Sequence, residues 1–228
     1  MKIGIIGLGY VGLPLAVALA DHYQVYGYDT DATRVSQLNN YIDRNEGVTR
    51  VELLGRLGKD LQLSSKIEDL AYCEFYIITV PTPVDQYFIP NLSYLVKASE
   101  DVARILSKED IVVYESTVYP GTTKEICIPI LEKKSHLIAE KDFFVGYSPE
   151  RINPGDQNNT IKTVQKVISA NSPRALKKIK LLYESVVEAG TFSAVSIKTA
   201  EMAKIVENAQ RDVNIAFMNE VSKICHAM

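Results

Sequence analysis

The chain has 228 residues, of which 46% are hydrophobic and 23% are charged, and its formal net charge is −3 at pH 7. This is the composition of an ordinary globular protein with one large or two small domains. The weakly acidic balance gives no reason to expect nucleic acid or an anionic membrane as a partner. No apolar run is long enough to span a bilayer, and no signal-type segment precedes the first predicted strand, so we expect a cytoplasmic protein.

The first thirty residues follow the pattern strand, glycine turn, helix, strand and acid. An apolar run at residues 2–6 leads into GLGYVG at residues 7–12, followed by an apolar helix at 13–20 and a strand at 24–28. In this pattern Gly7 makes the tight turn, Gly9 lets the backbone approach a pyrophosphate, and Gly12 lets the helix pack closely on the strand. The start of the helix adds N–H groups and the positive end of a dipole. The pattern therefore predicts a dinucleotide site.

An acid, Asp29, closes the second predicted strand. A carboxylate at this place can bind the ribose hydroxyls and would repel a 2′-phosphate, which favours NAD over NADP. Arg34 leaves an alternative open, because an arginine nearby could bind that phosphate or stack on the adenine. We favour NAD as the cofactor.

Further along the chain, helices and strands alternate. We predict helices at residues 31–40, 92–106, 122–133 and 173–187, strands at 74–80, 111–114, 143–147 and 164–170, and a short apolar piece at 191–195. Residues 41–65 read as a polar surface connection that contains one helix. Alternation of this kind predicts an α/β fold with a doubly wound parallel sheet.

Polar residues gather where several predicted strands end. Thr82 follows one strand, Ser116 and Thr117 follow the next, and Glu150 follows the one after that. Each alone could be a simple turn residue. Because ligands bind outside the carboxyl ends of the strands in such sheets, we expect these residues and the glycine turn to share one site.

The last segment, residues 197–228, reads as one long helix without proline or glycine. Glu201, Lys204 and Asn208 share a face of it, and a lysine and an asparagine one turn apart could stabilise an oxyanion. The alternative is a solvated face with a Glu201–Lys204 ion pair. The helix has no glycine cap or proline stop, so we expect the natural protein to continue past Met228.

We predict two parts: a Rossmann-type NAD-binding domain at residues 1–196, and a central helix at 197–228 that begins a truncated middle domain. The helix carries an apolar stripe that includes Val213 and Phe217. We expect a second copy to cover it in a homodimer, the alternative being that it packs only on its own sheet.

The three cysteines, Cys73, Cys127 and Cys225, are widely spaced and contain no CxxC pair. This usage is typical of a reducing compartment and predicts no metal site. We expect each of them to be buried and inert.

Five motifs, taken together, resemble the N-terminal part of the UDP-glucose/GDP-mannose dehydrogenase family. They are GLGYVG at residues 7–12, VPTP at 80–83, ESTVYPGTT at 115–123, SPERINPG at 148–155 and KTAEMAKIVENAQRDVNIAFMNE at 198–220. The resemblance covers essentially the whole chain. It implies oxidation of a nucleotide-sugar C6 alcohol to a carboxylate with two NAD⁺, through an aldehyde and an enzyme thioester.

The resemblance also implies a role for each candidate site residue. The cofactor-binding residues would be Gly7, Gly9, Tyr10, Val11 and Gly12 at the pyrophosphate, Asp29 and Arg34 at the adenosine, and Thr82 and Thr117 at the nicotinamide. Glu150 would be a base acting through a water molecule that Thr117 orients. Lys204 and Asn208 would stabilise oxyanions at C6.

Two departures from the family pattern matter. Pro154 stands where the UDP-glucose branch has a second glutamate, and the SPERINPG form resembles the branch that acts on UDP-N-acetylhexosamines, gluco or galacto, in surface-polysaccharide biosynthesis. The family's nucleophilic cysteine lies in a GGHC-like motif of a C-terminal UDP-binding domain, and the 228 residues contain no such motif. We therefore expect this chain to bind NAD but to be incomplete for turnover.

Two other functions stay open. A β-hydroxyacid-type dehydrogenase also has a Rossmann domain followed by a helix with lysine and asparagine, although the ESTVYPGTT and SPERINPG segments argue against it. The other is a non-catalytic NAD-binding or interaction module.

Overall fold

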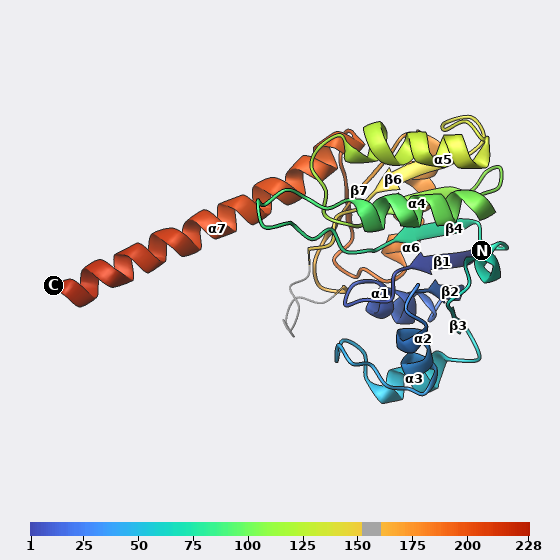
Figure 1. The fold of residues 1–228 in the computed structure, drawn as a ribbon, viewed down its shortest axis with the longest axis horizontal. Helices are drawn as coiled ribbons and strands as arrows, with labels where there is room; N and C mark the ends of the chain where they lie inside the picture. The colour runs from blue at the N-terminus through green and yellow to red at the C-terminus, as the bar shows by residue number, and fades with distance from the viewer. Residues whose placement is uncertain (152–160) are drawn as a thin grey trace.

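The computed structural model describes residues 1–151 and 161–228. In these residues one sheet of eight strands forms the centre of the body, in the order β3-β2-β1-β4-β5-β6-β7-β8 (Figure 1). The strands are β1 Lys2–Ile6, β2 Gln24–Tyr28, β3 Leu61–Ser64, β4 Phe75–Ile78, β5 Ile111–Tyr114, β6 Phe144–Tyr147, β7 Lys166–Ala170 and β8 Thr191–Ser193. The strand order reverses between β1 and β4, and such a reversal creates a crevice for ligands at the carboxyl ends of the strands.

The predicted parallel sheet is confirmed except at one pair. β6 and β7 run antiparallel, with Gly146 opposite Ala170, whereas the other neighbours are parallel. No helix lies between β6 and β7 in the described part of their connection. A parallel neighbour requires a crossover, usually a helix, so a strand that returns without one runs in the opposite direction.

Helices cover both faces of the sheet. They are α1 Gly12–Leu19, α2 Ala32–Asn39, α3 Arg50–Arg56, η1 Ile67–Leu70, α4 Ser93–Ile105, the π-helical turn η2 Thr123–Cys127, α5 Ile128–Ser135, α6 Pro173–Glu184 and α7 Ile197–Ala227. One core cluster joins the sheet to α1 and α6, and a second joins it to α4 and α5. Because both faces are covered, β4 and β5 are buried along their whole length, which explains their uninterrupted apolar sequences.

Strand β3 was not predicted from the sequence. Within residues 41–65 the expected helix is present as α3, but Leu61–Ser64 pairs with β2 at the edge of the sheet. Only Leu61 of this strand is fully buried. A four-residue edge strand with one buried side chain gives almost no periodic signal.

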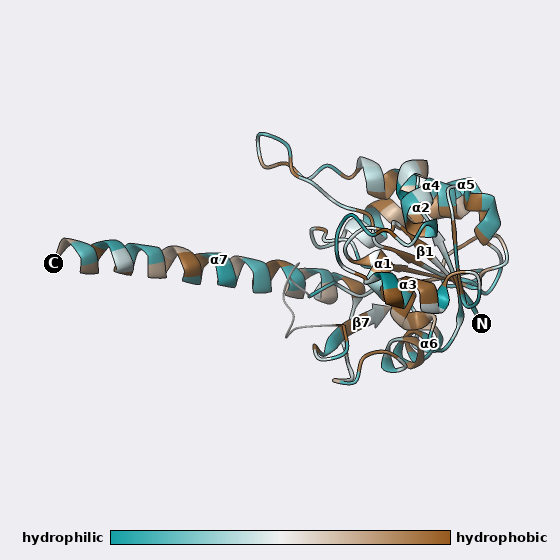
Figure 2. Cartoon of the chain, turned by 90° about the horizontal axis from the view of Figure 1, so that it is seen from below, coloured by the Kyte–Doolittle hydropathy of each residue, from teal (hydrophilic) through white to brown (hydrophobic). Residues whose placement is uncertain are grey.

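Helix α7 begins against the body and then extends away from it (Figure 1). Ala200 and Glu201 are the residues that it buries. Further along, Val213 and Phe217 are 66% and 64% exposed, and Figure 2 shows apolar and polar residues mixed along this extension. None of the helices in the described part of the chain is long and apolar enough to cross a membrane.

Candidate active site

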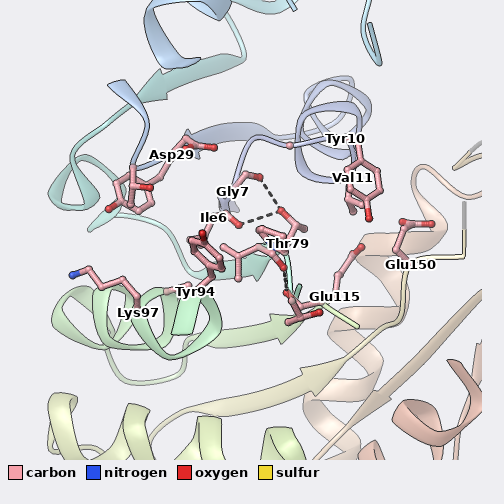
Figure 3. Close-up of a pocket in the computed structure, with 18 of the residues that line it drawn as sticks. Ile6, Gly7, Tyr10, Val11, Asp29, Thr79, Tyr94, Lys97, Glu115 and Glu150 are labelled. Atoms are coloured by element: carbon pink, nitrogen blue, oxygen red, sulfur yellow. Dashed lines mark hydrogen bonds between the residues drawn. The ribbon is translucent and has the colours of Figure 1, made fainter. Parts of the chain in front are cut away.

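A cavity of about 360 Å³ lies at the carboxyl ends of β1, β2, β4 and β5. Its lining brings together predicted site residues from separate motifs, namely Gly7, Gly9, Tyr10, Val11, Asp29, Thr82, Thr117 and Glu150. Asp29 and Lys97 lie at one end of the cavity, and Glu115 and Glu150 lie at the other (Figure 3). Four further candidates, Gly12, Arg34, Lys204 and Asn208, are not among its lining residues.

The glycine turn is fixed by close backbone packing. Gly7 has a positive φ of 96°, and its N–H donates to the Tyr28 carbonyl at 2.8 Å. The Thr79 hydroxyl donates to the Gly7 carbonyl at 2.8 Å (Figure 3). A Cβ at Gly12 would lie 1.9 Å from the Gly7 oxygen and 2.4 Å from Thr79 Oγ1. Gly12 therefore supports the site from behind, by letting α1 approach the turn.

Gly9 has the opposite surroundings. No atom lies within 4 Å of the position that a Cβ at Gly9 would take, and Gly9 lines the cavity. Helix α1 starts three residues later without a side-chain cap on its first N–H groups. Open space beside an uncapped helix start fits the diphosphate of NAD, which hydrogen-bonds to such groups.

Asp29 is held at the end of β2 by two backbone N–H groups. Its carboxylate accepts from the Leu8 N–H at 2.8 Å and from the Asp31 N–H at 2.9 Å. Lys97 is the one basic side chain among the described lining residues, and it pairs with Asp101 at 2.8 Å. This end of the cavity thus suits ribose hydroxyls and not a 2′-phosphate.

Arg34 is a buried residue next to the glycine turn. Its side chain is 2% exposed, with Nη2 2.7 Å from Asp43 Oδ1. Its Nε donates to the Leu8 carbonyl at 3.0 Å. In this structure Arg34 braces the turn against the loop that contains Asp43. No pattern in the sequence predicted that ion pair.

The segments after β4 and β5 are tied together at the middle of the cavity. The Thr82 hydroxyl donates to the Thr117 carbonyl at 2.5 Å, and the Ser116 hydroxyl donates to the Val80 carbonyl at 2.6 Å. These bonds bring VPTP and ESTVYPGTT side by side, as the sequence predicted for the carboxyl ends of neighbouring strands.

Glu150 belongs to a charge cluster that sequence reasoning missed. Lys166 Nζ lies 3.1 Å from Glu150 Oε2 and 2.8 Å from Glu115 Oε2, and the Tyr183 hydroxyl donates to the other Glu115 oxygen. The side chains of Glu115, Lys166 and Glu150 are 0%, 5% and 13% exposed. The available signal was a lysine at the start of a largely apolar strand.

Glu201 does not lie on a solvated face, so that part of the alternative for the last helix is wrong. Its buried carboxylate accepts from the Gly121 N–H at 2.5 Å and from the Thr123 N–H at 2.9 Å. These contacts attach the first turn of α7 to the ESTVYPGTT segment. The glutamate is buried because those N–H groups at the start of η2 need an acceptor.

Lys204 lies partly buried on α7, and Asn208 is exposed. Burial lowers the pKa of Lys204 below its ordinary value, although the Glu207 and Glu150 carboxylates oppose this shift. Arg151, which follows Glu150, binds Glu207 with its Nε 3.1 Å from Oε2. Lys204 is therefore within electrostatic reach of the cavity.

The predictions for Pro154 and for the three cysteines remain. Residues 152–160 lie outside the described residues, and Pro154 is among them. Cys73 and Cys127 are buried as predicted, and burial raises the pKa of each thiol to about 12. The prediction is wrong for Cys225, which is exposed because no other element of the described residues lies beside this part of α7.

Comparison with known proteins agrees with the motifs. Residues 1–187 match the NAD binding domain of the UDP-glucose/GDP-mannose dehydrogenase family, and residues 198–228 match its central domain. The UDP-N-acetyl-D-glucosamine 6-dehydrogenase of Salmonella typhi is 50% identical over 224 residues, which are 98% of this chain and 52% of the relative. The chain spans about half the length of the curated relatives it matches.

Solved structures show the same fold. The UDP-D-ManNAc dehydrogenase of Pyrococcus horikoshii superimposes with a TM-score of 0.87 at 35% identity, over 96% of this chain and 53% of that one. A 3-hydroxyisobutyrate dehydrogenase of Mycobacterium tuberculosis, at 16% identity and a TM-score of 0.62 over 91% of this chain and 58% of that one, shares the fold alone. The chain therefore belongs to the UDP-glucose/GDP-mannose dehydrogenase family, and residues 1–187 form its NAD-binding domain.

Proposed function

We propose that this chain is the NAD-binding part of a UDP-N-acetylhexosamine 6-dehydrogenase. The reaction converts the C6 alcohol of the sugar to a carboxylate, passes one hydride to each of two NAD⁺, takes its second oxygen from water and releases protons. The observation that carries the proposal is the single cavity that runs from the glycine turn and Asp29 to Thr117 and Glu150.

The cofactor end binds NAD, which supplies the hydride acceptor. Gly7, Gly9, Tyr10, Val11 and Gly12 form or support the surface for the diphosphate, and Asp29 binds the adenosine ribose. Arg34 holds the turn next to the adenosine. Thr82 and Thr117 face the nicotinamide.

The catalytic end acts on the sugar C6 atom. Glu150 takes a proton from a water molecule that Thr117 orients, while the water oxygen forms the bond to the C6 carbonyl carbon and the thioester sulfur leaves as a thiolate. Lys204 and Asn208 donate hydrogen bonds to the oxyanions that form at C6. No GGHC-like motif occurs in the 228 residues, so the thiol would come from outside them.

The substrate proposal rests on the relatives and on the SPERINPG motif. The 50% identical relative is named for UDP-N-acetyl-D-glucosamine, and SPERINPG resembles the N-acetylhexosamine branch. Both the gluco and the galacto epimer remain candidates, and parallel assays with the two nucleotide sugars distinguish them.

We further propose a cytoplasmic homodimer with a role in polysaccharide biosynthesis. The domain division falls at residues 196/197, and α7 forms the dimer contact. Val206, Val213, Phe217 and Ile224 recur at helical spacing and are all more than half exposed. Light scattering tests this assembly. Phe217→Glu should shift the protein toward monomer or aggregate, and an unchanged dimer would contradict it.

The test of the cofactor proposal is calorimetric titration with NAD⁺ and NADP⁺. We expect NAD⁺ to bind about tenfold or more tightly than NADP⁺. Gly9→Val places a side chain in the open space for the diphosphate and should remove NAD⁺ binding while the protein stays folded. Gly55→Val is the matched control, because Gly55 also has no atom within 4 Å of its Cβ position but lies in α3, outside the cavity lining.

The same titration, followed by a turnover assay, separates the alternatives. Wild-type protein that binds neither nucleotide would overturn the proposal. If Gly9→Val and the control Gly55→Val both bind NAD⁺ like the wild type, the diphosphate does not bind beside Gly9. An active β-hydroxyacid dehydrogenase would instead reduce one NAD⁺ per turnover with a hydroxyacid and without a nucleotide sugar.

A further inference from the structure

The charge cluster behind Glu150 has a geometry that links it to the cavity. Glu150 and Glu115 both line the cavity, whereas Lys166 lies behind them in the interior. Lys166 Nζ contacts one carboxylate on each side, at 2.8 and 3.1 Å, and lies 5.2 Å from the centre of the Tyr183 ring. The lysine is thus held on three sides, and it fixes Glu150 Oε2. The Arg151 N–H donates to Glu150 Oε1 at 2.6 Å.

The number of charges matters as much as their positions. With Glu150 as its single partner, Lys166 would become an uncompensated buried cation whenever Glu150 took up a proton, and such a charge is strongly unfavourable. Glu115 removes that difficulty, because it stays paired with Lys166 in both protonation states of Glu150. A base that must take up and release a proton needs this kind of second partner behind its counter-ion.

The proton affinities agree with this arrangement. Burial opposes the charge on Lys166, but Glu115 and Glu150 outweigh it and raise the pKa of the lysine above its ordinary value. Burial raises the pKa of Glu115, with Lys166 acting in the opposite direction. The lysine therefore stays protonated near neutral pH.

We propose that Lys166 and Glu115 are positioning residues for Glu150: Lys166 fixes the Glu150 carboxylate at the cavity wall, and Glu115 balances the lysine so that Glu150 can accept a proton. This role rests on the proposed function, in which Glu150 is the base. Both residues act through Glu150: Lys166 pairs with it directly, and Glu115, although it also lines the cavity, acts by way of Lys166.

Other charged groups also face this site. On α7, Lys204 lies within electrostatic reach of Glu150, and Glu207 binds Arg151. On α6, Tyr183 donates to Glu115. None of these residues is substituted in the variants below. A change in the pKa of Glu150 therefore reports on Lys166 and Glu115.

The test is a titration of the Glu150 carboxyl group by ¹³C NMR in the 228-residue protein, with the signal assigned by Glu150→Gln. In Glu115→Gln the full charge of Lys166 acts on Glu150, so we expect the pKa of Glu150 to fall. In the double variant Glu115→Gln/Lys166→Met the cation is gone, and we expect the pKa to rise by about 1 to 3 above that of Glu115→Gln. Lys166→Arg keeps the charge and should stay near wild type.

The opposite signs make the result decisive. A purely structural role would leave the pKa of Glu150 unchanged in Glu115→Gln, or would give the double variant the same Glu150 pKa as Glu115→Gln, and either result overturns the proposal. Because the double variant replaces the buried pair with neutral side chains, it keeps the test usable if other substitutions unfold. NAD⁺ titration of the wild-type sample judges the proposed function separately, since absent binding would overturn that function while the NMR result still decides the role of Lys166.

Discussion

The two ends of the cavity are built in different ways. The cofactor end consists mainly of backbone: a turn that requires Gly7 and Gly12, open space at Gly9, and an aspartate held by two N–H groups. The catalytic end consists of charged side chains from four separate places in the chain, namely the ends of β5 and β6, the start of β7 and the first turns of α7. The first end is a local structure, and the second depends on long-range contacts.

The largest effect should come from breaking the charge cluster. Lys166→Met leaves Glu115, which is fully buried, without its cation. We expect the free energy of unfolding to fall by about 3–5 kcal/mol. Urea denaturation followed by circular dichroism measures this. Glu115→Gln/Lys166→Met should recover most of the loss, and equal stability of the single and double variants would show that the pair is not coupled.

At the cofactor end the expected loss has a steric origin. A Cβ in Gly12→Ala would lie 1.9 Å from a backbone oxygen, so α1 must move away from the turn. We expect a loss of about 3 kcal/mol, with weaker NAD⁺ binding as a consequence. Gly55→Ala has open space and serves as the control in the same denaturation experiment. Wild-type stability in Gly12→Ala would contradict the packing described for the turn.

The attachment of α7 should show a smaller effect. Glu201→Gln weakens two hydrogen bonds to a buried carboxylate, at Gly121 and Thr123. We expect a loss of about 2 kcal/mol. Glu220→Gln, on the exposed part of the same helix, should change stability very little. If both variants behave alike, the first turn of α7 is not fixed by Glu201.

The smallest effect concerns the pH dependence of Lys204. Burial lowers its pKa, and a lowered lysine pKa means that the neutral, reactive amine forms at a lower pH than for an ordinary lysine. Mass spectrometry after acylation over a pH series should show this midpoint below the ordinary value of 10.5. Glu207→Gln removes a carboxylate that opposes the shift, and should move the midpoint lower still. A midpoint at or above 10.5 would place Lys204 on a solvated face.

The contrast between the two ends also explains what the sequence could reveal. Gly7, Gly9, Gly12 and Asp29 lie within one strand–turn–helix–strand unit, so spacing alone predicted their arrangement. Glu150 was found as a motif residue at a strand end. Its partner Lys166 became its neighbour because β7 returns antiparallel beside β6, and no local pattern predicts that pairing.

Long-range contacts account for the other differences too. Periodicity placed Glu201 on one face of the last helix, but its partners are N–H groups 78 and 80 residues away. Arg34 was assigned to the adenosine, whereas its ion pair with Asp43 depends on how the loop after α2 folds back. In each case the residue was recognised and its contact was not.

A crystal structure of the protein with NAD⁺ tests the central claim most directly, because it shows whether one cavity joins the two ends. We predict the diphosphate beside Gly9 at the start of α1, the adenosine ribose on Asp29, and the nicotinamide beside Thr117 on the side of Glu150. A nucleotide bound outside this cavity, or bound inside it with the nicotinamide at the Asp29 end, would contradict the account.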